Sequence, residues 1–441
     1  MMSEGNEKYT EHLRGIVQIP SVSTVNDEAT DWKQFEALHE YLAKCYPLVH
    51  QKAELIPVGK ASLLFHLKSK EAKKLPVLLM AHQDVVPAIH PEQWTYPPFS
   101  AAVADGCIWG RGSEDCKSLL IEELEAMEEL LEENFEPDFD IYLSFGHNEE
   151  VQCADDKKGS VLAARYLKEQ GIKIGCIFDE GGNVDEGAVP VANVALAEKA
   201  PNEFVIYQDG AGGHASKPGR GTVLGVVSKA AAIIEAHPMP YRLTPLTKAY
   251  LKASAPFAGK DREKIYRHPK KHWKSLCRLA KKDRELDALL HTTFALTMAQ
   301  AASQANVLPS HAEMTMSVRI LQGDTVESVR EYLESILPKD IRVKVTFGED
   351  PKPEGRTDSR EFKQLAGIIR EVFGNETAVI PSIMLGATDS RNYYEVCDNI
   401  FRFSGRYKTK KWGEAHQVDE RMPIEGLEMA VRFFKTFLKK Y

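Results

Sequence analysis

The fold is decided by the stretch Leu75-Pro76-Val77-Leu78-Leu79-Met80-Ala81-His82-Gln83-Asp84-Val85-Val86-Pro87. Its apolar run shows no alternation with polar residues, which is typical of a strand covered on both faces in the middle of an α/β sheet. The run ends on His82 and Asp84, which point to the same face because they lie two residues apart. A carboxylate there can accept one ring N–H and leave the other nitrogen free for a metal ion. Taken alone, the pair is more often a half-buried histidine beside a turn aspartate.

Acidic residues recur at similar places further along the chain. They are Glu149 and Glu150 after the predicted strand 137–145, Asp179 and Glu180 after the predicted strand 174–178, and Asp115 in the first turn of a predicted helix. A single aspartate of this kind is usually a helix cap, and a Glu-Glu pair usually lies in a surface loop. Ligands of open α/β sheets, however, collect outside the carboxyl ends of the strands. The repeated placement therefore predicts a site for hard metal ligands at one edge of the sheet.

Two later histidines stand in loops. His214 lies at the tip of the glycine-rich segment 209–219, where the backbone can approach a ligand closely. His416 lies in the segment 413–420, before a final helix with apolar residues at helical spacing. A loop histidine is more often structural or exposed than functional. If the carboxyl-terminal segment completes the first domain, His416 can supply the second imidazole of a two-metal site.

Composition places the chain among ordinary globular proteins. It has 441 residues, is 43% hydrophobic and 27% charged, and carries a formal net charge of −8, which argues against a dedicated nucleic-acid binder. No apolar run approaches the roughly 20 residues that span a membrane, and the acidic segment Met1–Glu7 is unlike a signal peptide. Seven scattered cysteines without a C-x-x-C pair suit reduced thiols. We therefore expect a cytoplasmic protein.

The order of predicted elements divides the chain into three segments. Residues 1–199 and 349–441 have α/β character and are expected to form one domain, while 200–348 reads as an inserted α+β domain with helices on one face of a sheet. Within the insert, Lys260–Arg284 carries 11 Lys or Arg against 3 Asp or Glu. This segment is interpreted as a solvated amphipathic helix, in preference to a nucleic-acid or membrane patch.

Six motifs in order resemble one known family, the co-catalytic zinc peptidases that include aminoacylase, carboxypeptidase S, glutamate carboxypeptidases and succinyl-diaminopimelate desuccinylase. The motifs are Met80–Pro87, Gly110–Lys117, His147–Val151, Asp179–Gly182, Gly212–Ser216 and Ala415–Glu420. They span nearly the whole chain. The resemblance implies an α/β, three-layer catalytic domain with an inserted ferredoxin-like lid and dimerisation domain. The long insert looks most like the carboxypeptidase S branch.

The resemblance also implies roles for individual residues. Five metal ligands are expected: His82, Asp115 as the bridge, Glu150, Asp179 and His416, with Glu180 as the competitor of Asp179. The catalytic residues are Glu149 as general base, Asp84 orienting His82, and His214, which reaches the site of a partner subunit and steadies the oxyanion. Asn306, Arg319 and Gly386 are expected from the resemblance to hold the substrate's carboxylate. Gln152 and Cys153 stand where the family usually has a glycine-rich continuation after Val151. This departure bears on the subfamily and the substrate more than on the metal site.

The implied activity is metal-dependent hydrolysis of an amide bond next to a free carboxylate, in dipeptides, short peptide C-termini or N-acyl amino acids. Two divalent metal ions are expected, with zinc favoured by the histidine and carboxylate ligands and cobalt or manganese also suited to them. The alternative enzyme is a specialised N-acyl amino acid amidohydrolase, such as a deacylase or desuccinylase. A ligand-binding relative without activity and a nucleic-acid role for Lys260–Arg284 are further alternatives. A homodimer formed through the insert is expected from the resemblance.

Overall fold

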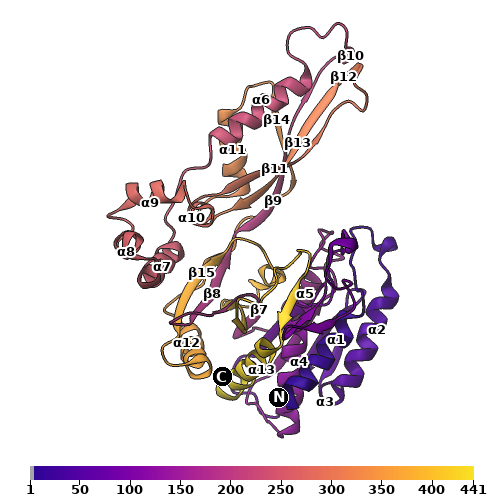
Figure 1. Ribbon diagram of the computed structural model, residues 1–441, viewed down its shortest axis with the longest axis vertical. Coiled ribbons are helices and arrows are strands. Elements are labelled where there is room, and N and C mark those ends of the chain that lie inside the picture. Colours follow the sequence, from indigo (N-terminus) through magenta and orange to yellow (C-terminus); the bar gives the residue numbers. More distant parts are fainter. Residues whose placement is uncertain (1–3) are drawn as a thin grey trace. The chain divides into compact units, whose positions relative to one another are not determined.

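The computed structural model describes residues 4–441, so that Met1–Ser3 of the predicted acidic amino-terminal segment lie outside the described residues. The chain forms two compact units (Figure 1). The first unit comprises Met1–Leu196, Gly355–Pro381 and Thr388–Tyr441. The second unit comprises Ala197–Glu354 and Ser382–Ala387. Each unit has a sheet and a hydrophobic core of its own.

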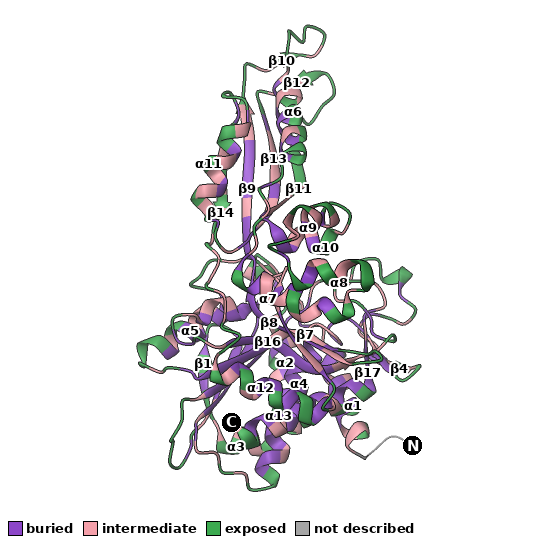
Figure 2. Cartoon of the chain, turned by 90° about the vertical axis from the view of Figure 1, so that its left-hand side faces the viewer, coloured by how far each residue is buried: buried purple, intermediate pink, exposed green. Residues whose placement is uncertain are grey.

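The first unit is built on a mixed eight-stranded sheet in the order β1-β2-β6-β3-β7-β16-β8-β15. Its strands are β1 (Glu54–Val58), β2 (Ser62–Leu67), β3 (Val77–His82), β6 (Ile141–Gly146), β7 (Cys176–Asp185), β8 (Val191–Glu198), β15 (Ala378–Met384) and β16 (Ile400–Lys408). The neighbours β6, β3, β7 and β16 run parallel. Every residue of β3 and β6 is buried, as the unbroken apolar run predicts for β3. The labelled strands β8 and β16 of the same sheet are also mostly buried (Figure 2).

Helices cover both faces of this sheet. The helices are α1 (Glu4–Val17), α2 (Trp32–Cys45), α3 (Pro47–Lys52), α4 (Lys117–Glu132), α5 (Gly159–Glu169), α12 (Arg360–Phe373) and α13 (Ile424–Lys440), with short 3-10 turns η1 (Asp27–Ala29), η2 (Pro91–Gln93) and η4 (Asp389–Tyr393). α4 and α13 pack on one face with α1 and α12 beside them, whereas α5 and η4 lie on the other face. A small sheet of β4 (Ala102–Ala104), β5 (Cys107–Trp109) and β17 (Arg421–Pro423) joins distant segments. The three-layer α/β class is confirmed.

β7 is longer than the sequence indicates. The predicted strand ends at Phe178, whereas β7 continues to Asp185 and contains both Asp179 and Glu180. β16 pairs with β7 in parallel along this extension and supplies hydrogen-bond partners that the sequence alone does not reveal. Because neighbouring residues of a strand point to opposite faces, Asp179 and Glu180 have different surroundings.

The second unit contains a four-stranded antiparallel sheet in the order β11-β13-β9-β14. Its elements are β9 (Ala200–Asp209), β10 (Gly213–His214), α6 (Val223–Ala236), β11 (Thr293–Gln300), β12 (Val307–Leu308), β13 (His311–Ile320), α11 (Val326–Ile336) and β14 (Arg342–Phe347). α6 and α11 share one core with the sheet. The chain order β9-α6-β11-β13-α11-β14 and the strand order confirm the predicted ferredoxin-like sandwich. β10 and β12 form a separate two-stranded ribbon.

The basic segment Lys260–Arg284 is not one helix, and this prediction is wrong. It contains α8 (Lys260–Arg267) and α9 (Trp273–Ala280), and it ends where α10 (Arg284–Leu290) begins. Together with α7 (Pro245–Ser254) and the turn η3 (Ala255–Phe257), these short helices enclose a small apolar core of their own. The lysines and arginines lie mostly on the exposed side, as a solvated face requires. Among residues 4–441, no helix combines the length and apolar character that crossing a membrane requires.

Candidate metal centre

Imidazole and carboxylate side chains from four segments of the first unit meet at one place. His82 lies at the end of β3, and its Nε2 is 2.9 Å from Oδ1 of Asp115, just before α4. Oδ2 of Asp115 is 3.1 Å from Nε2 of His416. The same nitrogen of His416 is 3.0 Å from Oε2 of Glu150, in the loop after β6. Asp115 therefore lies between two imidazoles, as a bridging ligand must.

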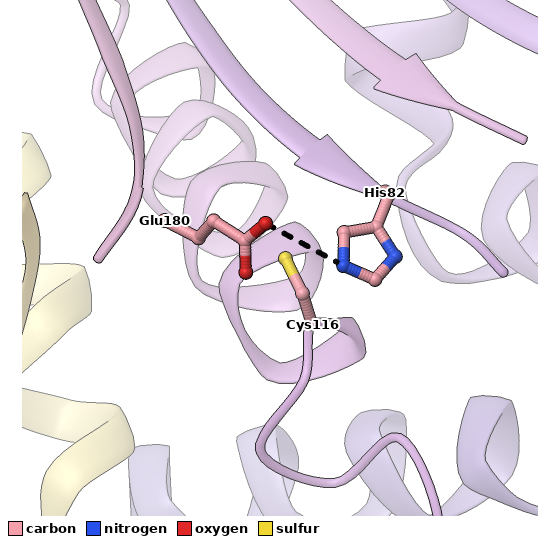
Figure 3. A group of neighbouring side chains, drawn as sticks. All are labelled: His82, Cys116 and Glu180. Atoms are coloured by element: carbon pink, nitrogen blue, oxygen red, sulfur yellow. Dashed lines mark ion pairs between the residues drawn. The ribbon is translucent and has the colours of Figure 1, made fainter. Parts of the chain in front are cut away.

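The Asp-Glu pair of β7 is arranged in the opposite way to the preferred prediction. Oε1 of Glu180 is 3.8 Å from Nε2 of His82 (Figure 3). The carboxylate of Asp179 accepts hydrogen bonds from the backbone N–H of Ser390 and of Glu180, both at 2.9 Å. The structure thus places Glu180, and not Asp179, beside His82. The alternation of faces along β7 turns Asp179 toward η4 and leaves Glu180 beside His82.

Asp84 connects His82 with the glutamate pair. Nδ1 of His82 is 2.9 Å from the backbone carbonyl oxygen of Asp84 and 3.5 Å from its carboxylate, so that the carbonyl is the nearer of the two acceptors. The Asp84 carboxylate accepts the backbone N–H groups of Glu149 and Glu150, both at 3.1 Å, and the hydroxyl of Ser23. Asp84 thus fixes the loop that carries both glutamates. The sequence does not indicate a role for Ser23, because its segment meets the residues after β3 through an isolated bridge between Val22 and Val85.

Glu149 lies in a buried polar surrounding. Nζ of Lys158 donates to the backbone carbonyl of Glu149 at 3.2 Å and lies 3.5 Å from the buried carboxylate of Asp389. Burial, followed by the charge of Asp389, raises the pKa of Glu149 to about 8. A carboxylate whose pKa lies near neutrality can both take up and release a proton, which suits a general base. Neither Lys158 nor Asp389 was predicted to take part.

A buried ion pair holds the loops of Asp115 and His416 together. Oε1 of Glu420 accepts three backbone N–H groups of the segment 112–115, at 2.9, 2.9 and 3.2 Å. Its other oxygen pairs with the guanidinium of Arg111, which also donates to the backbone carbonyl of His416 at 3.3 Å. Glu420 lies in one of the quoted motifs, but nothing in the sequence indicates which loop it holds.

The pKa values of the side chains in the centre are shifted because several carboxylates and imidazoles lie close together. Hydrogen bonds to Asp115 and Glu150 raise the pKa of His416 to about 10. Although burial disfavours its charged form, hydrogen bonds from His416 and His82 hold the pKa of Asp115 far below its usual range. Burial raises the pKa of Glu180 well above its ordinary value. The side chains thus share protons where carboxylate oxygens and imidazole nitrogens face one another.

These residues fit divalent metal ions. A neutral imidazole nitrogen and a carboxylate oxygen both present lone pairs, so that their close approach requires a proton or a cation between them. His82, Asp115 and Glu150 offer ligand atoms that all lie within 4.8 Å of one another. Nitrogen and oxygen ligands of this kind suit zinc, cobalt and manganese.

The predicted residues of the second unit do not meet in this way. His214 is exposed on β10, with Nδ1 2.8 Å from the hydroxyl of Ser216. Asn306 is also exposed, and its backbone carbonyl accepts the N–H of Ala215 at 3.0 Å. Arg319 lies eight residues along β13 from His311, which places it roughly 25 Å from the β12 end of that strand. Gly386 lies in the loop between β15 and η4 and is half-buried.

Comparison with known proteins decides the family. Residues 78–440 match Peptidase family M20/M25/M40. The chain belongs to this family. It is 31% identical to the probable carboxypeptidase S-like 2 of Dictyostelium discoideum, over 93% of this chain and 81% of that protein. It is 32% identical to the N-fatty-acyl-amino acid synthase/hydrolase PM20D1.1 of Danio rerio, over 98% of this chain and 85% of that protein.

Solved structures share the fold of this M20 chain. The M20 family metallo-carboxypeptidase Sso-CP2 from Sulfolobus solfataricus superposes with a TM-score of 0.74 at 20% identity, covering 100% of this chain and 99% of that one. The Bacillus subtilis YXEP protein, a dinuclear metal-binding peptidase of the M20 family, gives 0.57 at 15% identity, with 99% of both chains covered. These likenesses show the fold. The family match confirms the predicted family and the predicted enzyme class, a metallohydrolase of the carboxypeptidase type.

Proposed function

We propose that this M20 hydrolase cleaves an amide bond next to a free carboxylate, in dipeptides, short peptide C-termini or N-acyl amino acids. The observation that carries the proposal is the convergence of His82, Asp115, Glu150, Glu180 and His416 beside the half-buried Glu149. Peptidases and N-acyl amino acid hydrolases among the relatives support the same chemistry.

The proposed centre holds two divalent metal ions. His82 and Glu180 face one position, Glu150 and His416 face the other, and Asp115 lies between the two histidines. Bound divalent ions lower the pKa of a coordinated water from about 15.7 toward 7 and polarise a carbonyl oxygen. Zinc is the proposed metal because imidazole and carboxylate ligands suit it, and cobalt or manganese is expected to replace it.

Glu149 is the proposed general base. Its backbone N–H is anchored on Asp84 and its carbonyl on Lys158, which fix the peptide unit that carries the side chain. The carboxylate accepts a proton from the attacking water and delivers it to the departing amine. Asp84 holds both His82 and the loop of Glu149 in position during both steps.

We also propose that the protein works as a cytoplasmic homodimer. The separation between exposed His214 and Arg319 along the second unit supports a dimer, because one copy alone does not bring the two side chains together. In a dimer, His214 of one copy steadies the oxyanion in the other copy, while Asn306, Arg319 and Gly386 hold the carboxylate. Sedimentation analysis tests the dimer. The cytoplasmic location is supported by seven cysteines that are all free thiols, and fractionation of cells tests it.

A specialised N-acyl amino acid amidohydrolase is the second candidate, favoured by the N-fatty-acyl-amino acid synthase/hydrolases among the relatives. Substrate profiling separates the two. The protein is loaded with zinc, cobalt or manganese and given matched dipeptides and N-acyl amino acids, and products are separated by mass. Turnover of the dipeptides supports a peptidase, and turnover confined to N-acyl amino acids supports the amidohydrolase. No cleavage of either class by the metal-loaded protein contradicts the proposed function.

A further inference from the structure

Cys116 places a thiol inside the candidate metal centre. It follows Asp115 directly, stands at the amino-terminal end of α4, and is only 1% exposed. Its Sγ, a ring nitrogen of His82 and a carboxylate oxygen of Glu180 all lie within 4.8 Å of one another. Figure 3 shows the sulfur between the imidazole and the carboxylate, with the three side chains coming from β3, β7 and the start of α4.

Other thiols of the chain have different surroundings. The Sγ of Cys397 donates to the carbonyl of Asn399 at 3.3 Å, and the Sγ of Cys107 lies 3.8 Å from the carbonyl of Lys411. Those sulfurs face peptide oxygens in the way that structural buried cysteines do. The sulfur of Cys116 instead faces two side chains that are themselves metal ligands in the proposed function.

The two halves of the centre consequently differ in ligand chemistry. The half around His416 offers only imidazole nitrogen and carboxylate oxygen, from His416, Glu150 and Asp115. The half around His82 adds a sulfur to the same types of donor. Thiolate is a soft ligand that favours zinc or cadmium over manganese and magnesium, and a His, Cys and carboxylate combination is within the usual range for zinc.

We propose that Cys116 is a protein ligand, together with His82 and Glu180, of one of the two metal ions. This inference rests on the metal centre of the proposed function. On binding, the S–H bond of Cys116 breaks, a sulfur–metal bond forms, the proton leaves to solvent, and the metal stays divalent. The centre is then asymmetric, with a thiolate-containing position that retains zinc and an all-nitrogen-and-oxygen position that exchanges its metal more readily.

Cobalt spectroscopy tests the inference independently of turnover. The full-length protein is stripped of metal and titrated with Co²⁺, while the bound metal is counted and the near-ultraviolet spectrum recorded. The wild type should show a thiolate-to-cobalt charge-transfer band, and Cd²⁺ should give the corresponding sulfur band. Cys116→Ser should lose the band and Cys277→Ser, changed in the second unit, should keep it. Chelator competition should show at least about a 10-fold weaker zinc affinity for one of the two sites in Cys116→Ser.

The result that overturns the inference is a wild-type protein that binds cobalt and is active but has no thiolate band. Retention of the band in folded Cys116→Ser overturns it equally. If both Cys116→Ser and Cys116→Ala fail to fold by circular dichroism, the wild-type spectra in Co²⁺ and Cd²⁺ still decide. A wild-type protein that binds no divalent metal contradicts the proposed function itself, which separates that failure from failure of the Cys116 assignment.

Discussion

The candidate residues of the first unit converge, whereas those of the second unit are dispersed. His82 and His416 come from distant segments, and each lies within hydrogen-bonding distance of Asp115. His214 lies on the separate two-stranded ribbon, whereas Arg319 lies near the far end of β13 in the four-stranded sheet. Parallel strands carry their carboxyl ends to one edge of a sheet, and antiparallel strands do not. Side chains that follow parallel strands therefore meet within one chain. The candidate side chains of the second unit, which lie on antiparallel strands, do not meet in this way.

Removing Glu149, the proposed base in the first unit, should have the largest effect. Glu149→Gln keeps the size and the backbone anchors of the residue but cannot take up a proton. We expect turnover to fall by about 10²–10⁴-fold with metal content unchanged. Steady-state kinetics and metal analysis measure both. Glu169→Gln, an exposed glutamate on α5, is the matched control and should behave like the wild type. Near-normal turnover of Glu149→Gln would remove Glu149 from the mechanism.

Removing the exposed histidine of the second unit tests whether the dispersed residues are functional at all. His214→Ala should lower turnover by about 10²–10³-fold, the usual effect of losing one donor to an oxyanion. The melting temperature and the metal content should not change, because His214 is exposed and lies outside the first unit. His268→Ala, also exposed in the second unit, is the control. Full activity of His214→Ala would show that the second unit contributes no catalytic histidine.

Substitution of Glu420, which pairs with Arg111, tests how the first unit positions its proposed metal ligands. Glu420→Ala removes the acceptor of three N–H groups beside Asp115 and leaves Arg111 without its carboxylate. We expect metal affinity to fall about 10–100-fold, the usual cost of losing a group that orients metal ligands. Glu420→Gln should recover part of it, since one acceptor oxygen remains. Chelator competition measures the affinity. Glu414→Ala, exposed in the same loop, is the control, and equal affinities of Glu420→Ala and the wild type would refute the role of the pair.

The pair of His12 and Glu125 lies outside the metal centre, and its loss should affect only the stability of the folded protein. His12 lies 2.5 Å from the buried carboxylate of Glu125. Burial opposes protonation, but hydrogen bonds with Cys45 and Glu125 raise the pKa of His12 to about 9. Because the folded pKa exceeds the unfolded value near 6.5, the stabilisation is fully present below pH 6.5 and is lost as the pH rises through about 9.

Urea unfolding of wild type and His12→Gln at several pH values checks this expectation. The wild type should be more stable by about 1–2 kcal/mol below pH 6.5, after allowance for solvent screening of a partly exposed ring. The difference should shrink toward pH 9, and metal affinity should be the same in both proteins. A difference that grows with pH would contradict the assigned protonation of His12.

The sequence indicates the convergence because strand ends can be recognised in it. The apolar runs that end near His82 and Glu149 are β3 and β6, both buried on every residue. The sequence does not tell Asp179 from Glu180, because that choice depends on how far β7 continues and on which face each residue occupies. Glu420 and Cys116 lie inside recognised motifs, yet their partners are set by tertiary packing. The charge pattern of Lys260–Arg284 predicts one helix, because charge periodicity alone does not show where short helices break.

Anomalous diffraction from crystals of the zinc-loaded protein, recorded at the zinc absorption edge, tests the central claim most directly. Two peaks are expected among His82, Asp115, Glu150, Glu180 and His416, with the peak between His82 and Glu180 touching the sulfur of Cys116. Zinc peaks bound elsewhere on the chain, with none among these side chains, would contradict the account.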